Sequence, residues 1–266
     1  MHAFEYHRPA SSKDALSLIK GKSEARFLAG GQSLVQAMKL RLSAPSDLID
    51  LGTIKELAGI KVSGSTVEIG AMTRHADVAG SAEVKKAIPA LAALAGMIGD
   101  RQVRHMGTIG GSLANNDPAA DYPAAVLGLG ATVTTNKRKI EADKFFKGLY
   151  ETALEPGELI TAVSFPVPKR AAYMKFKNPA SRFAIVGVFV ADFGGGKVRV
   201  GVTGAGASAF RQAEMEKALA AKFAPESVAN IKVKPEGLNN DLHASPEYRA
   251  HLITVMAKRA VEAATK

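Results

Sequence analysis

Two short segments of the chain combine glycines with hydroxyl-bearing side chains. They are residues 29–33 (AGGQS) and 108–112 (TIGGS). Because glycine lets the backbone approach a ligand closely, such segments can direct several N–H groups at one anion, for example a pyrophosphate. Taken alone, each is as readily a tight turn, since short glycine motifs have low specificity. The occurrence of two favours an anion site.

A third segment, residues 204–209 (GAGASA), has the G-x-G-x-x-A spacing of dinucleotide-binding turns. The strand before it is predicted to pair with another strand through the glycine turn at 194–196. That arrangement is an antiparallel hairpin and not a strand–helix–strand unit. We therefore interpret residues 204–209 as a structural turn.

Metal and hydrolytic chemistry have little support. Asn115, Asn116, Asp117 and Asp121 lack the alternating spacing of a calcium loop, and the scattered histidines include no HExxH pair. Neither a nucleophile elbow nor a paired-carboxylate motif is present. We assign no metal ligand and no catalytic residue, a pattern typical of proteins whose chemistry belongs to a bound cofactor.

Local patterns predict the elements that would position the glycine-rich segments. Short apolar and β-branched runs bounded by turn residues predict strands. These are residues 26–28, 47–51, 60–62, 67–69, 131–135, 159–165, 173–177, 184–191 and 197–202. Apolar residues at helical spacing predict helices. These begin at Ser11 or Ser12, after Ser33, at Pro89, after Phe210 and at Ser245 followed by Pro246.

Two further features concern boundaries. Asp117 followed by Pro118 is typical of a helix start, so we expect a helix there. The pattern changes near Gly59, and the proline-containing stretch 166–168 resembles a linker, so we expect further units to begin after each.

Composition limits the possible functions. Of 266 residues, 47% are hydrophobic, and no apolar stretch approaches the length of a transmembrane helix. The start lacks a secretory signal pattern, so we expect a cytoplasmic protein. The net charge is +10, but the basic residues are dispersed and do not alternate with aromatic ones, which argues against nucleic-acid binding. The chain has no cysteine, so any iron–sulfur cluster must belong to a partner.

The two glycine-rich segments in context, FLAGGQSL and GTIGGSLA, resemble those of the FAD-binding medium subunits of molybdenum hydroxylases, such as carbon monoxide dehydrogenase and xanthine dehydrogenase. The likeness extends from the opening FEYHRP through DPAAD and NPASR to EYR near the end. It implies an α+β fold, with a two-part FAD-binding module of the vanillyl-alcohol-oxidase type. On this resemblance, residues 1–57 and 58–168 form the two FAD-binding subdomains, and residues 171–266 form a C-terminal domain with a small antiparallel sheet and helices.

The resemblance also implies which residues contact FAD. The residues that would hold the pyrophosphate are Ala29, Gly30, Gly31, Gln32, Ser33, Thr108, Gly110, Gly111 and Ser112. Their neighbours Phe27, Leu28, Leu34 and Ile109 would also belong to the cofactor-binding residues. Asp121 matches a carboxylate that hydrogen-bonds FAD, and Ile98 stands where relatives place an apolar ring. Ile160 matches a residue whose backbone meets the isoalloxazine, and Lys177 matches a lysine near the same ring.

By the same resemblance, electrons would pass from a large subunit with a molybdenum cofactor, through [2Fe–2S] clusters in a small subunit, to FAD here, and then to an external acceptor. We expect a dimer of heterotrimers. Three alternatives stay open: a stand-alone flavin oxidoreductase, a noncatalytic nucleotide-binding assembly protein, and NAD binding at residues 204–209. The organic substrate and the final acceptor are not encoded in recognisable motifs.

Overall fold

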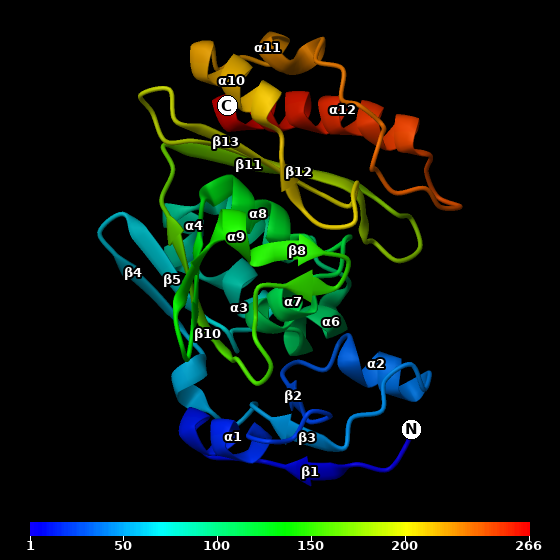
Figure 1. The fold of residues 1–266 in the computed structure, drawn as a ribbon. Coiled ribbons are helices and arrows are strands. Elements are labelled where there is room, and N and C mark those ends of the chain that lie inside the picture. Colours follow the sequence, from blue (N-terminus) through cyan, green and yellow to red (C-terminus); the bar gives the residue numbers. More distant parts are fainter.

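The computed structural model describes residues 1–266, which form three stacked regions (Figure 1). We call residues 1–57 the N-terminal lobe, residues 58–168 the central region and residues 169–266 the C-terminal region. Each region contains a buried hydrophobic cluster, and helices are combined with mainly antiparallel sheets. The predicted α+β fold class is confirmed.

The N-terminal lobe contains a three-stranded parallel sheet in the order β1-β3-β2. Its elements are β1 (Glu5–His7), α1 (Ser12–Ile19), β2 (Arg26–Leu28), α2 (Leu34–Lys39), β3 (Asp47–Asp50) and the 3₁₀ helix η1 (Lys55–Leu57). Its hydrophobic cluster has only seven buried residues, and one of them, Leu159, comes from the central region. The lobe therefore depends on the central region for part of its core.

The central region contains a five-stranded antiparallel sheet in the order β4-β5-β10-β6-β7. The strands are β4 (Ile60–Ser63), β5 (Thr66–Gly70), β6 (Thr132–Thr135), β7 (Lys139–Glu141) and β10 (Ile160–Pro166). The helices are α3 (His75–Gly80), α4 (Ala82–Ala87), α5 (Pro89–Gly96), α6 (Arg101–Met106), α7 (Ile109–Asn115), α8 (Tyr122–Leu129) and α9 (Ala142–Phe145). A small hairpin pairs β8 (Phe146–Gly148) with β9 (Glu151–Thr152).

The C-terminal region is an antiparallel sheet between helices. Its elements are β11 (Arg170–Lys177), β12 (Ala184–Asp192), β13 (Val198–Thr203), β14 (Phe210–Arg211), α10 (Ala213–Ala221), α11 (Glu226–Ala229) and α12 (Pro246–Thr265). Helix α12 packs on one side of the sheet and α8 on the other (Figure 1). Every residue of β12 and of α8 is buried as a result, which explains why both are almost entirely apolar; the exceptions are Asp192 at the end of β12 and the hydroxyl of Tyr122.

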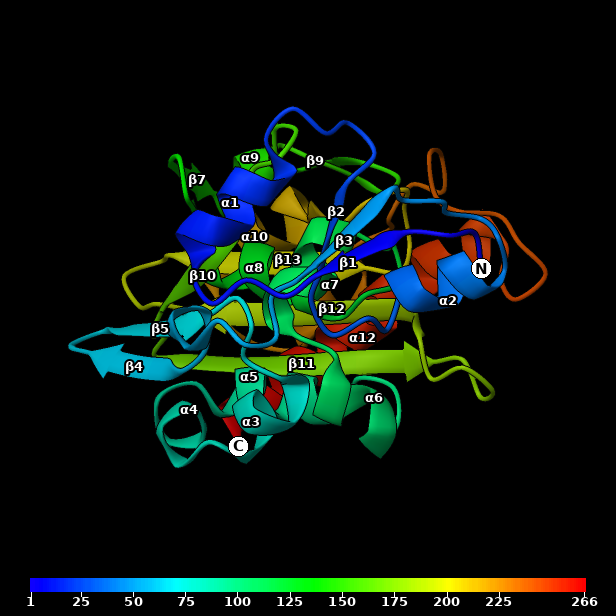
Figure 2. The same ribbon diagram turned by 90° about the horizontal axis from the view of Figure 1, so that it is seen from below.

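The predicted strands are all present, with small differences at their ends. Strand β13, which precedes residues 204–209, pairs antiparallel with β12, so the interpretation of that segment as a structural turn is confirmed. Figure 2 shows the N-terminal lobe in front of the sheet of the C-terminal region when the molecule is seen from below. None of the helices is both long enough and apolar enough to cross a membrane.

The helix expected at Asp117 begins four residues later. Asp117 instead accepts a hydrogen bond from the N–H of Ala119 in a tight turn, and α8 starts after Asp121 with Pro123 in its first turn. The reason is tertiary, because the carbonyl of Pro118 accepts hydrogen bonds from the end of β13 and from Gly204. Asp121 directly precedes α8, but its side chain makes no capping hydrogen bond with the helix.

Candidate functional site

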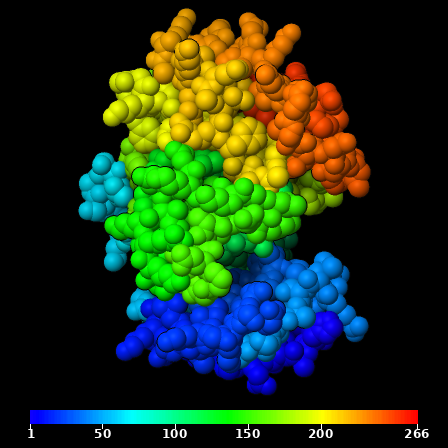
Figure 3. Space-filling view, in the orientation of Figure 1, coloured from blue at the N-terminus to red at the C-terminus, as the bar shows by residue number.

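A cavity of about 700 Å³ lies between the N-terminal lobe and the central region. Figure 3 shows an indentation between the blue and green surfaces at this level. Residues 29–34 line it from the lobe, residues 107, 108 and 110–112 line it from the central region, and residues 180–183 reach it from the C-terminal region. The fold therefore brings the two glycine-rich segments to one site, although they are far apart in the sequence.

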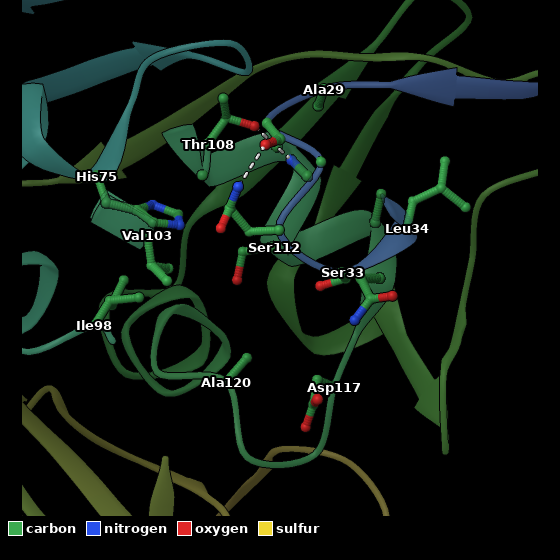
Figure 4. A pocket seen from close by; sticks show the side chains of 18 of the residues that line it. Ala29, Ser33, Leu34, His75, Ile98, Val103, Thr108, Ser112, Asp117 and Ala120 are labelled. Carbon is green, nitrogen blue, oxygen red and sulfur yellow. Dashed lines mark hydrogen bonds between the residues drawn. The ribbon is translucent and has the colours of Figure 1, made fainter. Parts of the chain in front are cut away.

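The first glycine-rich segment connects β2 with α2 and has unused backbone donors. The N–H groups of residues 30–34 donate to no acceptor within the chain. Gly31 adopts φ +69°, a left-handed conformation that glycine accepts without strain. The side chain of Gln32 donates to the carbonyl of Gly30 at 3.2 Å (Figure 4). Unpaired N–H groups at the edge of a cavity are suited to binding an anion.

The second glycine-rich segment is the first turn of helix α7 rather than a loop. Thr108 caps the helix, and its Oγ1 accepts a hydrogen bond from the N–H of Gly111 at 3.2 Å (Figure 4). The N–H of Gly110 donates to the carbonyl of Ala71 at 2.8 Å. Both N–H groups are already hydrogen-bonded within the chain, so they are not free to bind an anion. The expectation of free backbone donors therefore fits the first segment better than the second. The second offers the hydroxyl of Ser112, which has no partner within the chain and lines the cavity.

The two segments pack closely, since a Cβ atom at Gly111 would lie 3.3 Å from the Cβ of Ala29, and both also approach neighbouring residues. A Cβ atom at Gly30 would lie 2.1 Å from the carbonyl oxygen of Met106 and 2.6 Å from Cα of Gly107. A Cβ atom at Gly110 would lie 2.5 Å from the Cβ of Ala71. Such distances are far inside van der Waals contact, so these glycines are needed for close packing of the segments against their neighbours.

A buried carboxylate lines the cavity where the central region meets the C-terminal sheet. Asp121 accepts hydrogen bonds from the hydroxyl of Tyr173 and from Nζ of Lys175, the latter at 2.9 Å. Burial raises the pKa of Asp121 above its ordinary value, although Lys175 and Tyr173 both act to lower it. An ion pair thus stands behind this wall of the cavity.

On another wall, His75 lies near Ile98 and Val103 (Figure 4). Burial and the charge of Arg104 lower the pKa of His75 to about 4, so its imidazole is neutral at physiological pH. Its ring lies 5.4 Å from that of Tyr122, and its Nδ1 has no hydrogen-bond partner. His75, Ile98 and Val103 therefore place no charge at the cavity.

Ile160, at the start of β10, lines the cavity next to Glu158. Burial by itself would raise the pKa of Glu158, but hydrogen bonds from Arg138, the N–H of Glu155 and the hydroxyl of Thr135 outweigh it and hold the pKa at about 2. The carboxylate is thus ionised and fully engaged within the protein.

Most of the residues predicted to contact a ligand line this cavity; Leu28, Ile109 and Lys177 do not. The side chain of Ile109 is fully buried in the core of the central region. Lys177 is exposed at the end of β11, and the lysine bonded to Asp121 is Lys175. The other predicted residues lie at the cavity as expected: Phe27, Ala29, Gly30, Gly31, Gln32, Ser33, Leu34, Ile98, Thr108, Gly110, Gly111, Ser112, Asp121 and Ile160.

Several lining residues were not predicted. They include His75, Val103, Tyr150, Glu158, Arg182 and Phe183. Tyr150 and Arg182 both have positive φ, in the hairpin turn between β8 and β9 and in the connection after β11. The NPASR sequence that ends at Arg182 was part of the resemblance, but nothing local in it indicates a role at a cavity. Their placement depends on long-range packing.

Comparison with known proteins places these features in a family. Residues 2–168 match the family described as FAD binding domain in molybdopterin dehydrogenase. The chain is 37% identical to the carbon monoxide dehydrogenase medium chain of Afipia carboxidovorans, over 98% of this chain and 96% of that one. It is 34% identical to the glyceraldehyde dehydrogenase medium chain of Sulfolobus acidocaldarius, over 97% and 96%.

Solved structures agree with the sequence comparison. The structure of reconstituted CO dehydrogenase from Oligotropha carboxidovorans superposes with a TM-score of 0.90 and 36% identity, over 98% of this chain and 97% of that one. Quinoline 2-oxidoreductase from Pseudomonas putida 86 gives a TM-score of 0.88 at 29% identity, over 98% and 96%. The chain therefore belongs to the FAD-binding medium subunits of molybdenum hydroxylases, and it is an oxidoreductase subunit whose cofactor is FAD.

Proposed function

We propose that this chain holds FAD in the cavity between its lobe and its central region and relays electrons from [2Fe–2S] clusters of a small partner subunit to an external acceptor. The observation that carries the proposal is the set of unpaired N–H groups at residues 30–34 beside a cavity of about 700 Å³. A cavity of this size is in the range for cofactor sites, and the donors suit a pyrophosphate. When bound, FAD supplies the redox chemistry, and the protein fixes and tunes it.

Within this proposal the residues have distinct roles. Residues 29–34 and the hydroxyl of Ser112 bind the pyrophosphate, and Gly110 and Gly111 keep the second segment close. Asp121, Ile98 and Ile160, which line the cavity, would contact the isoalloxazine ring, the two isoleucines as its apolar neighbours. The neutral imidazole of His75 avoids adding charge to the wall it forms. No residue of the chain needs to act as an acid or base for electron relay.

Partners are proposed on the names of the relatives and on the composition. The relatives include medium chains of carbon monoxide dehydrogenases and the nicotine 6-hydroxylase medium subunit of Paenarthrobacter nicotinovorans, and a medium chain implies larger and smaller companions. Because this chain has no cysteine, the clusters belong to the small subunit and the molybdenum cofactor to the large one. We propose a dimer of such heterotrimers in the cytoplasm.

We also propose that residues 1–57 and 58–168 are the two FAD-binding subdomains and that residues 171–266 are the C-terminal domain. Three separate hydrophobic clusters support this division. The shared residue Leu159 and the burial of α8 against the C-terminal sheet indicate that the three parts fold together.

The first test is an absorption spectrum of the purified chain after incubation with FAD and removal of free cofactor. We expect a flavin spectrum with one FAD per chain, and its loss in Gly31→Ala, where the new Cβ would lie 2.9 Å from Val35. Gly21→Ala is the matched control, because Gly21 also has positive φ but has nothing within 4 Å and lies outside the cavity. Absence of flavin from the chain, both alone and co-expressed with its natural partners, would refute the proposal.

A further inference from the structure

Asp121, Tyr173 and Lys175 form a buried polar cluster at the junction of two regions. Asp121 directly precedes α8, whereas Tyr173 and Lys175 belong to β11 of the C-terminal sheet. The side chains of Lys175 and Asp121 are 2% and 4% exposed, and Lys175 also donates to the carbonyl of Met97. Only Asp121 lines the cavity, so the lysine stands behind the carboxylate.

The strand geometry explains why the paired lysine is Lys175. Residues two apart on a strand point to the same face, so Tyr173 and Lys175 both reach Asp121. Lys177 would continue this series, but the register of β11 against β12 shifts between Phe176 and Lys177. The extra residue at this irregularity, Ile185, lies on β12, and Lys177 is the last residue of β11. Lys177 is exposed at this end of the sheet.

The opposite strand leaves room for this cluster. Gly187 on β12 is the register partner of Lys175, and a Cβ atom there would lie 2.2 Å from the hydroxyl oxygen of Tyr173. The packing of β12 therefore holds the hydroxyl against Asp121. Helix α8, strand β11 and strand β12 thus together position the carboxylate of Asp121.

We infer that Lys175, acting through Asp121, sets the electrostatic potential at the flavin end of the cavity and thereby the reduction potential of the bound FAD. The inference rests on the proposed function, in which the isoalloxazine ring lies beside Asp121. Lys175 is a positioning residue, since it reaches the cavity only through the carboxylate. Charges in a poorly solvated environment interact strongly, so an unbalanced charge here acts on the ring.

The sign of each effect follows from charge balance. Reduction of the flavin by two electrons, supplied by an external reductant, increases the negative charge on the ring. In Lys175→Met the loss of the ammonium raises the pKa of buried Asp121 further. At pH values above that pKa, the unpaired carboxylate opposes the charge on the ring, so the potential becomes more negative. In Asp121→Asn the unpaired ammonium favours it, so the potential becomes more positive. The double variant removes both charges and returns the potential towards that of the wild type.

The experiment is a spectroelectrochemical titration of FAD in the full chain, co-expressed with its natural partners, with FAD content and circular dichroism measured for each variant. We expect opposite shifts in the two single variants, each at least tenfold in the equilibrium constant, or about 30 mV for a two-electron couple. Lys169→Met, an exposed lysine directly before the same strand and outside the cavity, is the control and leaves the potential unchanged. Lys175→Arg keeps the charge and restores the wild-type value.

Different results would refute the proposed function and the inference about Lys175. A wild-type protein without FAD refutes the proposed function itself. If FAD is bound but Lys175→Met has the wild-type potential, or both single variants shift in one direction, the inference about Lys175 is wrong. If a single variant fails to fold, the double variant and Gly187→Ala, which displaces the Tyr173 hydroxyl, test the same cluster. The inference about Lys175 is also wrong if Gly187→Ala has the wild-type reduction potential and the double variant has a potential that differs from that of the wild type.

Discussion

The direct contact between the two glycine-rich segments makes Gly30→Ala a severe perturbation. The added methyl group would meet the carbonyl oxygen of Met106 at 2.1 Å and Cα of Gly107 at 2.6 Å. All of its nearest neighbours are backbone atoms, so no side chain can rotate away. Because ordinary contact begins at 3.4 Å, the first segment must move away from the second by roughly 1 Å.

The size of the effect follows from this displacement. Overpacking of a close-packed site costs about 1–3 kcal/mol. The lobe has a small core and can relieve the clash by moving away from the central region, but this movement separates the groups that hold FAD on both sides. We expect the strain to be expressed mainly in the bound state, so the Kd for FAD rises roughly 5-fold to 150-fold.

Fluorescence titration of the apoprotein with FAD measures this change, and thermal unfolding with and without FAD reports any loss of the fold. Gly80→Ala is the matched control, because Gly80 has no neighbour within 4 Å of the added atom and ordinary φ. It should bind FAD like the wild type. If Gly30→Ala retained both the affinity and the melting temperature of the wild type, the explanation based on segment contact would be wrong.

Three further predictions concern buried polar groups and a helix cap. The pKa of Glu158 is about 2 in the folded protein against an ordinary 4.5, so its contribution to the free energy of unfolding is complete above pH 4.5 and is lost as the pH falls through 2. Denaturant unfolding should therefore show Glu158→Gln less stable than the wild type at pH 7, with a difference in stability that narrows in acid. A difference that stayed constant with pH would contradict this. Tyr122→Phe removes a buried hydroxyl without a partner, so the free energy of unfolding should stay equal or rise by about 1 kcal/mol, whereas a clear loss would reveal a hidden partner. Ser245 accepts from the N–H of Tyr248 at the start of α12, and Ser245→Ala should cost about 1 kcal/mol in urea unfolding, with an unchanged midpoint refuting the cap.

Much of the fold could be predicted from the sequence because its signals are local. The hairpin of β4 and β5 follows from two short apolar runs joined by a turn, and the apolar run of β12 predicts a strand covered on both sides. The sequence 108–112 was also recognised as a glycine-rich site. Its helical conformation was missed, since glycine disfavours helices and only the cap by Thr108 and bonds to residues 71–73 make this turn helical.

The remaining parts of the site depend on packing that the sequence does not display. The resemblance implies that Lys177 lies near the flavin ring, but it gives no sign that Lys175, two residues earlier on β11, is paired with Asp121. The helix expected at Asp117 begins only after Asp121, and the carbonyl of Pro118 bonds the end of β13, a long-range contact that the sequence does not show. Tyr150 reaches the cavity from a hairpin turn that has no motif of its own.

The close approach of the glycine-rich segments also affects how such motifs are inherited. Gly30 and Gly110 are constrained by neighbouring backbone or Cβ atoms, so a descendant that had lost the cofactor would still be selected to keep them. Ser33 and Ser112, whose hydroxyls bond nothing within the chain, would be released to vary once the ligand was gone. In a genome survey, the glycines would therefore record ancestry and fold, and the two serines would report whether the cofactor is still used.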